Sequence, residues 1–299
     1  INIPQKLTTC NSYTYYGHGT FRNTGITSVV IPEGMTTIPA YTFYNCTTLE
    51  SIVLPDSVTT IGNSAFEGCS SLKTAELNEN LTTIGNNAFS GCSSLESVQM
   101  PESLETIGNY AFNGCSGLKT VNLNDGLKTI GERAFYGCSA LKEVEIPAST
   151  ATLNSYVFGS CTGLTEVKLN EGLTSIANDA FNGCSSLEEI VLPDSITTLG
   201  YNIFTGCKKL TSINLPKNLT TCNSYTRYGY GTFKDSGITT VIIPEGITTI
   251  PAYTFYNSTT LESVVLPDSV TTIGNNAFEG CGKLEEIWIP ESVSAINTN

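Results

Sequence analysis

Hydrophobic and polar positions recur along the chain with a period of 23 residues, and this period organises all that follows. A representative unit, residues 49–71, has the pattern L-x-x-I-x-L-P-x-x-V-x-x-I-G-x-x-A-F-x-G-C-x-x. All 12 phenylalanines of the chain occupy the same position of the unit. One such unit cannot bury its apolar residues alone, whereas stacked units share a continuous core. The period therefore predicts a repeat solenoid of about twelve rungs.

Within the unit, the spacing of apolar residues predicts the local structure. The alternating pair Ile52 and Leu54 predicts a short strand with one face inward, and Pro55 ends that strand because it cannot donate to a ladder. Residues 58–61 return the chain across the core. Residues 62–69 are expected to form a tight turn and then one short helical or 3-10 turn. Successive strands would pair in parallel about 4.8 Å apart, giving a curved rod.

The motif LPDSVTTIGNSAFEGCSSL, residues 54–72, and its copies resemble the BspA-like leucine-rich repeat family of bacterial surface proteins. The resemblance covers nearly the whole chain. It implies a leucine-rich-repeat solenoid, a right-handed superhelix with a concave parallel β-sheet. It also implies an extracellular or cell-surface location and a role in adhesion to host proteins or other cells. No residue of the motif carries over a defined ligand.

A second, longer period relates the two ends of the chain. An offset of 212 residues relates residues 1–87 to residues 213–299, and over residues 1–72 the two copies are nearly identical. We interpret residues 1–299 as a single solenoid and as an excerpt of a longer array, because no polar capping repeat is visible at either end. We expect a monomer, and the uncapped ends would allow end-to-end packing.

Two copies of a tyrosine-rich insertion interrupt the period, at residues 8–20 and 220–232. Each places ten residues where an ordinary unit has four. Loops of this kind are suited to binding, since Tyr and Gly make adaptable contacts; the alternative is that the tyrosines only cover the Phe21 and Phe233 rungs. A Cys10–His18 nucleophile pair is disfavoured because Tyr230 replaces the histidine in the second copy. The candidate binding residues of the insertions are Tyr13, Tyr15, Tyr16, His18, Tyr225, Tyr228 and Tyr230.

The outward positions of the predicted strands supply the other candidate site. Four acidic residues gather on successive rungs around Lys168, and Trp288 continues an apolar row at the C-terminal end. The acidic group fits a cation site, a patch for basic ligands or a glycosidase-like carboxylate pair. It equally fits a solvated strand face that opposes aggregation. Trp288 is a candidate interface anchor, or is shielded by further repeats. The acidic residues are Glu143, Glu145, Glu166 and Glu189.

Nine of the 11 cysteines fall at one repeat position, three residues after the phenylalanine. A disulfide scaffold or a metal site would need paired or clustered spacing. The uniform row, broken by Ser258, instead favours buried free thiols, so we predict no disulfides and no bound metal.

Composition narrows the remaining choices. The formal charge of −13 argues against nucleic acid as a partner. No apolar run approaches the roughly 20 residues of a membrane span, and no phosphate-binding loop or zinc-protease motif occurs. We expect no cofactor, no membrane insertion and no enzymatic activity. The leading hypothesis is a binding or adhesion module that recognises a protein or glycan through its concave face and inserted loops. The alternative is a structural spacer without a ligand.

Overall fold

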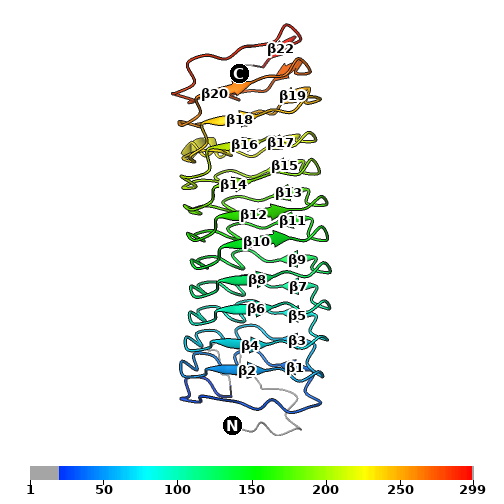
Figure 1. Cartoon of the computed structure of the whole chain (residues 1–299), viewed down its shortest axis with the longest axis vertical. Coiled ribbons are helices and arrows are strands. Elements are labelled where there is room, and N and C mark those ends of the chain that lie inside the picture. The colour runs from blue at the N-terminus through cyan, green and yellow to red at the C-terminus, as the bar shows by residue number, and fades with distance from the viewer. Residues whose placement is uncertain (1–19, 298–299) are drawn as a thin grey trace.

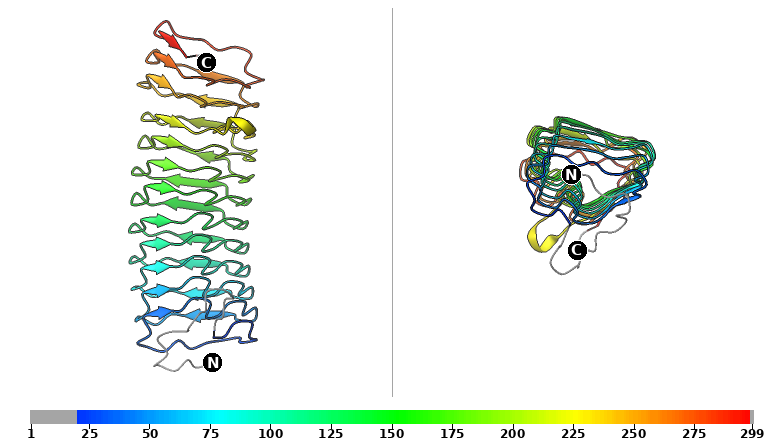
Figure 2. Two further views of the ribbon diagram at one scale, coloured as in Figure 1. Left: turned by 180° about the vertical axis from the view of Figure 1, so that it is seen from behind. Right: turned by 90° about the horizontal axis from the view of Figure 1, so that it is seen from below.

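The structure, a computed structural model, describes residues 20–297, which form one column of stacked rungs (Figure 1). Viewed from the end, each rung is roughly triangular (Figure 2). Two of its walls are parallel β-sheets, and the third is built from turns. The leucine-rich-repeat solenoid predicted from the period is therefore confirmed, with about eleven turns of about 23 residues.

The first sheet arises from the strand that the alternating apolar pairs predict. Most of its strands contain the burial pattern exposed–buried–exposed, as in β2, where Ile52 packs inward while Ser51 and Val53 face solvent. Pairing is parallel and joins equivalent residues of adjacent rungs, as in Ile52 with Ala75. The strands are β2 (Ser51–Val53), β4 (Thr74–Glu76), β6 (Ser97–Gln99), β8 (Thr120–Asn122), β10 (Glu143–Ile146), β12 (Glu166–Leu169), β14 (Glu189–Ile190), β16 (Ser212–Asn214), β18 (Thr240–Ile242) and β20 (Ser263–Val265).

A second parallel sheet lies where only a return across the core was expected. Its strands are two residues long and pair Thr with Thr and Ile with Ile between rungs, as in β3 and β5. The strands are β1 (Thr37–Ile38), β3 (Thr60–Ile61), β5 (Thr83–Ile84), β7 (Thr106–Ile107), β9 (Thr129–Ile130), β11 (Thr152–Leu153), β13 (Ser175–Ile176), β15 (Thr198–Leu199), β17 (Thr221–Cys222), β19 (Thr249–Ile250), β21 (Thr272–Ile273) and β22 (Ala295–Ile296).

The third wall, which we call the turn wall, comprises residues 62–69 and their equivalents in the other rungs. The short helical turn expected here was wrong: in the described chain the one helix is the 3-10 helix η1 (Thr226–Tyr228), inside the second insertion. Ser64 and Gly68 have φ of +56° and +75°. Residues in this left-handed conformation interrupt a helix and direct the N–H groups of alternate residues toward the adjacent rung. The Phe66 N–H therefore donates to the Ala88 carbonyl of the next rung at 2.8 Å, so the turn wall is also a ladder.

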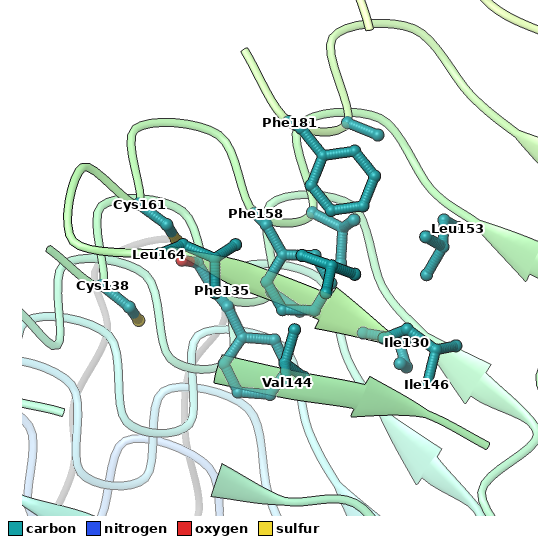
Figure 3. Packing of buried hydrophobic residues seen from close by; sticks show 14 of the residues in the cluster. Ile130, Phe135, Cys138, Val144, Ile146, Leu153, Phe158, Cys161, Leu164 and Phe181 are labelled. Carbon is teal, nitrogen blue, oxygen red and sulfur yellow. Dashed lines mark hydrogen bonds between the residues drawn. The ribbon is translucent and has the colours of Figure 1, made fainter. Parts of the chain in front are cut away.

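The core fills the triangle with one stack of phenylalanines. Adjacent rings lie nearly parallel, with centroids 5.2 Å apart for Phe89 and Phe112. Figure 3 shows Phe135, Phe158 and Phe181 one above another. Phe43 through Phe255 are fully buried at this position. The predicted core position of phenylalanine is confirmed.

The column is nearly straight, and its turns superimpose in the end-on view (Figure 2). The curved rod and the concave sheet that we expected are not seen. Curvature in a solenoid needs one wall with a taller repeat than the opposite wall, as a helix about 10 Å wide would provide. Here all three walls are extended or turn structure with a rung height of about 4.8 Å. Equal heights leave no reason to bend.

Both sheets are interrupted at the same step of the column, before the rung of residues 143–154. No ladder pair joins β8 to β10 or β9 to β11 there; farther along, the first sheet is also interrupted between β14 and β16 and the second between β17 and β19. In this rung Thr150 stands at a core position that is apolar in its neighbours, and Asn154 replaces the glycine that follows the second strand. The Asn154 Nδ2, in place of a backbone N–H, donates to the Ile130 carbonyl at 2.7 Å. We call this interruption the seam.

Candidate functional site

The second inserted loop, residues 223–232, projects from the column at one corner (Figure 2). Its backbone closes on itself: the N–H of Tyr225 donates to the Tyr230 carbonyl at 3.0 Å, and the N–H of Tyr230 donates back at 3.2 Å. Between them lie η1 and Gly229, whose φ of +67° suits glycine. The Asn257 Nδ2 donates to the Gly229 carbonyl at 3.0 Å. The loop is therefore hydrogen-bonded both within itself and to the next rung.

The three predicted tyrosines of this loop form one cluster. The ring centroids of Tyr225 and Tyr228 lie 5.0 Å apart, and those of Tyr228 and Tyr230 lie 5.8 Å apart. Tyr225 and Tyr228 remain 45% and 54% exposed. The Phe233 ring stacks between the rings of Phe204 and Phe255 without help from these tyrosines. The tyrosines thus present an aromatic surface to solvent. Tyr13, Tyr15, Tyr16 and His18 of the first insertion lie outside the described residues.

The predicted acidic group lies on the outer face of the first sheet. Glu143, Glu166 and Glu189 stand directly opposite one another on β10, β12 and β14. The Lys168 Nζ lies 2.6 Å from the Glu145 carboxylate, and this hydrogen bond lowers the pKa of Glu145. Both side chains are more than half exposed. Such a pair contributes little to stability.

A shallow hollow of about 450 Å³ opens beside this group, where the seam separates β8 from β10. It is lined by Asn122, Asp125, Glu143, Glu145 and Lys168 among others. No group of three or more potential metal ligands occurs among residues 20–297. The arrangement offers exposed carboxylates on an open sheet face rather than in a desolvated pocket.

An apolar row follows the same outer face toward the C-terminal end. Ile242, Val265 and Trp288 are 60%, 73% and 81% exposed. Val265 and Trp288 are neighbours on this face, since their backbones form a parallel β-bridge. A row of large exposed apolar side chains on a sheet is typical of an interaction surface. The structure thus separates the two predicted parts of this face into an acidic centre and an apolar end.

The sequence reasoning missed a second aromatic cluster, on the turn wall. The guanidinium of Arg133 lies over the rings of Tyr156, Tyr110 and Tyr136, with Cζ 4.6, 5.6 and 5.8 Å from the centroids. Tyr201 connects this cluster to the inserted loop, since its ring centroid lies 5.7 Å from that of Tyr230. A signal was present: Tyr110, Arg133 and Tyr156 recur at the 23-residue period.

The cysteine position is buried in eight rungs, as predicted, and half-buried at Cys281. In each of nine rungs the thiol donates to the phenylalanine carbonyl 26 residues earlier (25 for Cys46), as from Cys115 to Phe89 at 3.1 Å. Burial raises the pKa of the Cys115 and Cys161 thiols to about 12. Ser258, which breaks the row, is buried and its hydroxyl has no hydrogen-bond partner in the described chain.

The candidate residues identified from the sequence do not come together in one reactive site. The described part of the chain presents surfaces: an aromatic loop continued by a tyrosine cluster, an acidic face and an apolar row. No helix within residues 20–297 has the length and apolar character needed to cross a bilayer.

Comparison with known proteins places these surfaces in context. A crystal structure of a leucine-rich repeat protein from Bacteroides ovatus is 30% identical and covers 99% of this chain and 82% of its own, with a TM-score of 0.77. A leucine-rich cell surface protein from Faecalibacterium prausnitzii is 28% identical, covers 91% of this chain and 79% of its own, and has a TM-score of 0.51. The pneumococcal vaccine antigen PcpA, 23% identical over 99% of this chain and 73% of its own, shares the fold with a TM-score of 0.59.

No curated protein sequence matches the chain at a significant level. The family model for the BspA type leucine-rich repeat region matches in six copies, over residues 14–142, 128–230 and 226–299. These matches span almost the whole chain and agree with the motif, the period and the column. The chain therefore belongs to the BspA type leucine-rich repeat family.

Proposed function

We propose that this chain is a binding module of a bacterial cell surface and that its inserted loops make the principal contact with an extracellular partner. The location is supported by the similar protein of Faecalibacterium prausnitzii, which is described as a cell surface protein. The wider fold class, in which stacked rungs expose long continuous surfaces, is commonly used for recognition.

The observation that carries this proposal is the ordered, exposed loop. Aromatic contact area is most effective when little conformational entropy is lost on binding. The Tyr225–Tyr230 hydrogen bonds and the Asn257 contact hold the loop before any ligand arrives. A column that served only as a spacer has no need of this loop, because ordinary four-residue turns close the other described rungs.

The apolar row of Ile242, Val265 and Trp288 supports a second contact on the first sheet. A protein partner would bury such side chains at the centre of an interface, where aromatic anchors contribute most. The rival function, a spacer that projects another domain, uses the straightness of the column and leaves both surfaces unoccupied.

The test replaces each insertion with an ordinary turn. Residues 11–20 and 223–232 are both exchanged for Gly-Asn-Asn-Ala, the sequence of residues 274–277, which closes the equivalent turn. The wild-type and loop-exchanged proteins are then applied to immobilised extracellular-matrix proteins and to purified glycans. We expect the wild type to bind at least one surface and the exchange to weaken that binding by about tenfold or more.

Circular dichroism and urea unfolding check that the exchanged protein retains its fold. If the folded wild-type protein binds no surface in either set, the binding function is wrong and the spacer reading stands. If binding survives the exchange and is lost in Trp288→Ser, the apolar row rather than the loop is the contact.

A further inference from the structure

The turn wall contains residues that its backbone does not favour. The position of Ser64 has φ near +55° in every described ordinary rung. Asn and Asp tolerate this conformation, whereas a bulky side chain there is uncommon. Asn87, Asn202 and Asn276 occupy it in three rungs. Bulky residues occupy it singly at Tyr41 and Tyr253, and in three consecutive rungs as Tyr110, Arg133 and Tyr156.

These three side chains form one contact system rather than three separate exceptions. The Arg133 guanidinium lies over the Tyr156 ring at 4.6 Å, and its Nη1 donates to the Tyr110 hydroxyl at 3.2 Å. Tyr136, in the same rung as Arg133, lies edge-on to Tyr156 with centroids 6.2 Å apart. A planar cation among three rings orders them at small entropic cost.

A buried aspartate of the next rung, Asp179, holds this contact system in place from beneath the surface. Asp179 is 4% exposed, and its carboxylate accepts hydrogen bonds from Asn182 at 2.8 Å and from Tyr156 and Asn202. Because the Asn202 amide donates to Asp179, its Oδ1 is left as an acceptor, and that atom has no hydrogen-bond partner among residues 20–297. That atom and Asp179 are buried, so they hold the wall together from beneath, and the groups left half-exposed at its surface are the tyrosine rings and the Arg133 side chain.

Tyr201 extends the system to the inserted loop. Its ring centroid lies 6.4 Å from that of Tyr225 and 5.7 Å from that of Tyr230. The aromatic strip, defined as Tyr110, Arg133, Tyr136, Tyr156 and Tyr201, therefore runs parallel to the column axis over five rungs and meets the loop at one end.

We propose that the aromatic strip is a binding site for a linear, uncharged oligosaccharide that lies along the column and reaches the inserted loop. This inference rests on the binding function proposed above and names a ligand class for it. The C–H face of a sugar ring packs against the face or edge of an aromatic side chain, while its hydroxyls bond amides and guanidinium groups. Rungs repeated about every 4.8 Å suit a ligand that is itself a linear repeat.

The charges of the strip favour an uncharged chain. Arg133 is balanced by the buried Asp179 carboxylate and lies beside Glu132, with Nε and Oε1 3.9 Å apart. The net charge of −13 repels a polyanion such as a sulfated glycan. A proline-rich peptide is the other class of linear ligand that aromatic surfaces bind.

The test uses substitutions that the fold already accepts at this position. Tyr110→Asn with Tyr156→Asn places in the strip the residue found in the Asn87, Asn202 and Asn276 rungs. Tyr253→Asn is the matched control, because Tyr253 has φ of +61° at the same position outside the strip. Affinity electrophoresis and calorimetry are run against soluble uncharged polysaccharides, namely mixed-linkage glucan, xyloglucan, mannan and chitin oligosaccharides. Heparin and a polyproline peptide serve as alternative ligands.

We expect the wild type and the Tyr253 control to bind at least one uncharged polysaccharide equally and the double variant to bind it at least about tenfold more weakly. Equal binding by the double variant overturns the proposal, as does binding only to heparin or polyproline. If no polysaccharide binds while a matrix protein still binds through the loops, the glycan inference fails and the binding function stands. If nothing binds, both fail.

Discussion

At the scale of single residues, phenylalanine keeps successive rungs in register. Each ring lies between two others, and Phe112 is fully buried with centroids 5.2 and 5.3 Å from its neighbours. A stack of identical flat side chains packs closely only when every rung is aligned with the next. The period that is visible in the sequence is thus also the condition for close packing.

Removing one ring should open a cavity that the two adjacent rungs cannot fill. We expect Phe112→Ala to lower the free energy of unfolding by about 3–5 kcal/mol, and Phe112→Leu by roughly half as much. Urea unfolding followed by circular dichroism measures both. A loss below about 1 kcal/mol for the alanine variant would show that the rungs relax into the space.

The thiols should be chemically silent in the native protein. A pKa of about 12 for Cys115 and Cys161 leaves almost no thiolate near pH 8, and both side chains are buried. Cys281 is half-buried, with a pKa of about 11, so it should react first among the described cysteines. Reaction with a thiol reagent, with and without urea, measures this order. In Cys281→Ala the fastest phase from residues 20–297 should vanish; rapid labelling of Cys115 would contradict the burial.

At the scale of elements, each wall satisfies its backbone differently. The sheets pair through short strands, whereas the turn wall pairs alternate N–H groups through left-handed residues. Side-chain amides add another ladder beside it, as where the Asn86 Oδ1 accepts the Asn109 N–H at 2.8 Å. The glycine after the second strand is needed at this point: a Cβ on Gly108 would lie 2.6 Å from the Asn86 nitrogen.

The buried Asp179 of the turn wall should make stability depend on pH. Its pKa lies above 3.8 mainly because burial disfavours the charged form, although hydrogen bonds from Asn182, Tyr156 and Asn202 oppose the shift. A raised folded-state pKa contributes stability that is fully present below the unfolded value and is lost as the pH rises through the folded value. The stability of the wild type relative to Asp179→Asn should therefore fall between about pH 3 and about pH 7. Urea unfolding of both proteins across this range measures the difference; a flat or rising difference would mean that the hydrogen bonds outweigh burial.

At the scale of the whole molecule, the seam is the one step among residues 20–297 at which both sheets are interrupted together. Across it the turn wall still pairs, as the Phe135 N–H donates to the Val157 carbonyl at 2.9 Å. The two sheets do not pair there, and the buried Thr150 hydroxyl donates to the Leu127 carbonyl at 2.8 Å. In a solenoid, stability is close to a sum of rungs and their interfaces, so a weak interface is where the column opens.

We expect amide hydrogens in residues 143–154 to exchange faster than those of the equivalent rungs on either side. Thr150→Val with Asn154→Gly restores the ordinary repeat residues and should slow that exchange, while raising the free energy of unfolding by about 1 kcal/mol. Hydrogen exchange with mass spectrometry resolves the rungs. Uniform protection in the wild type would show that the seam is no weaker than the other interfaces.

The sequence by itself determined the period, the core and the first sheet. These depend on contacts between residues 23 apart, and in a stack that spacing always brings equivalent positions together, so Phe89 must meet Phe112. The outward row of Ile242, Val265 and Trp288 followed from the same alternation. The inserted loop was also visible, because it breaks the period.

Only the tertiary structure decided the second sheet, the straightness and the aromatic strip. The pattern marks residues 60–61 as inward-facing but does not say that two residues suffice to pair. Residues 64–68 read as a helical turn because φ is not encoded by hydrophobic spacing, and Tyr110 and Tyr156 gave no warning of a left-handed backbone. Straightness then follows from three walls of equal rung height. Arg133 contacts three tyrosines because the turn walls of successive rungs lie on the same side of the column. That common side is fixed by the packing of all rungs together, which the hydrophobic pattern of one unit does not reveal.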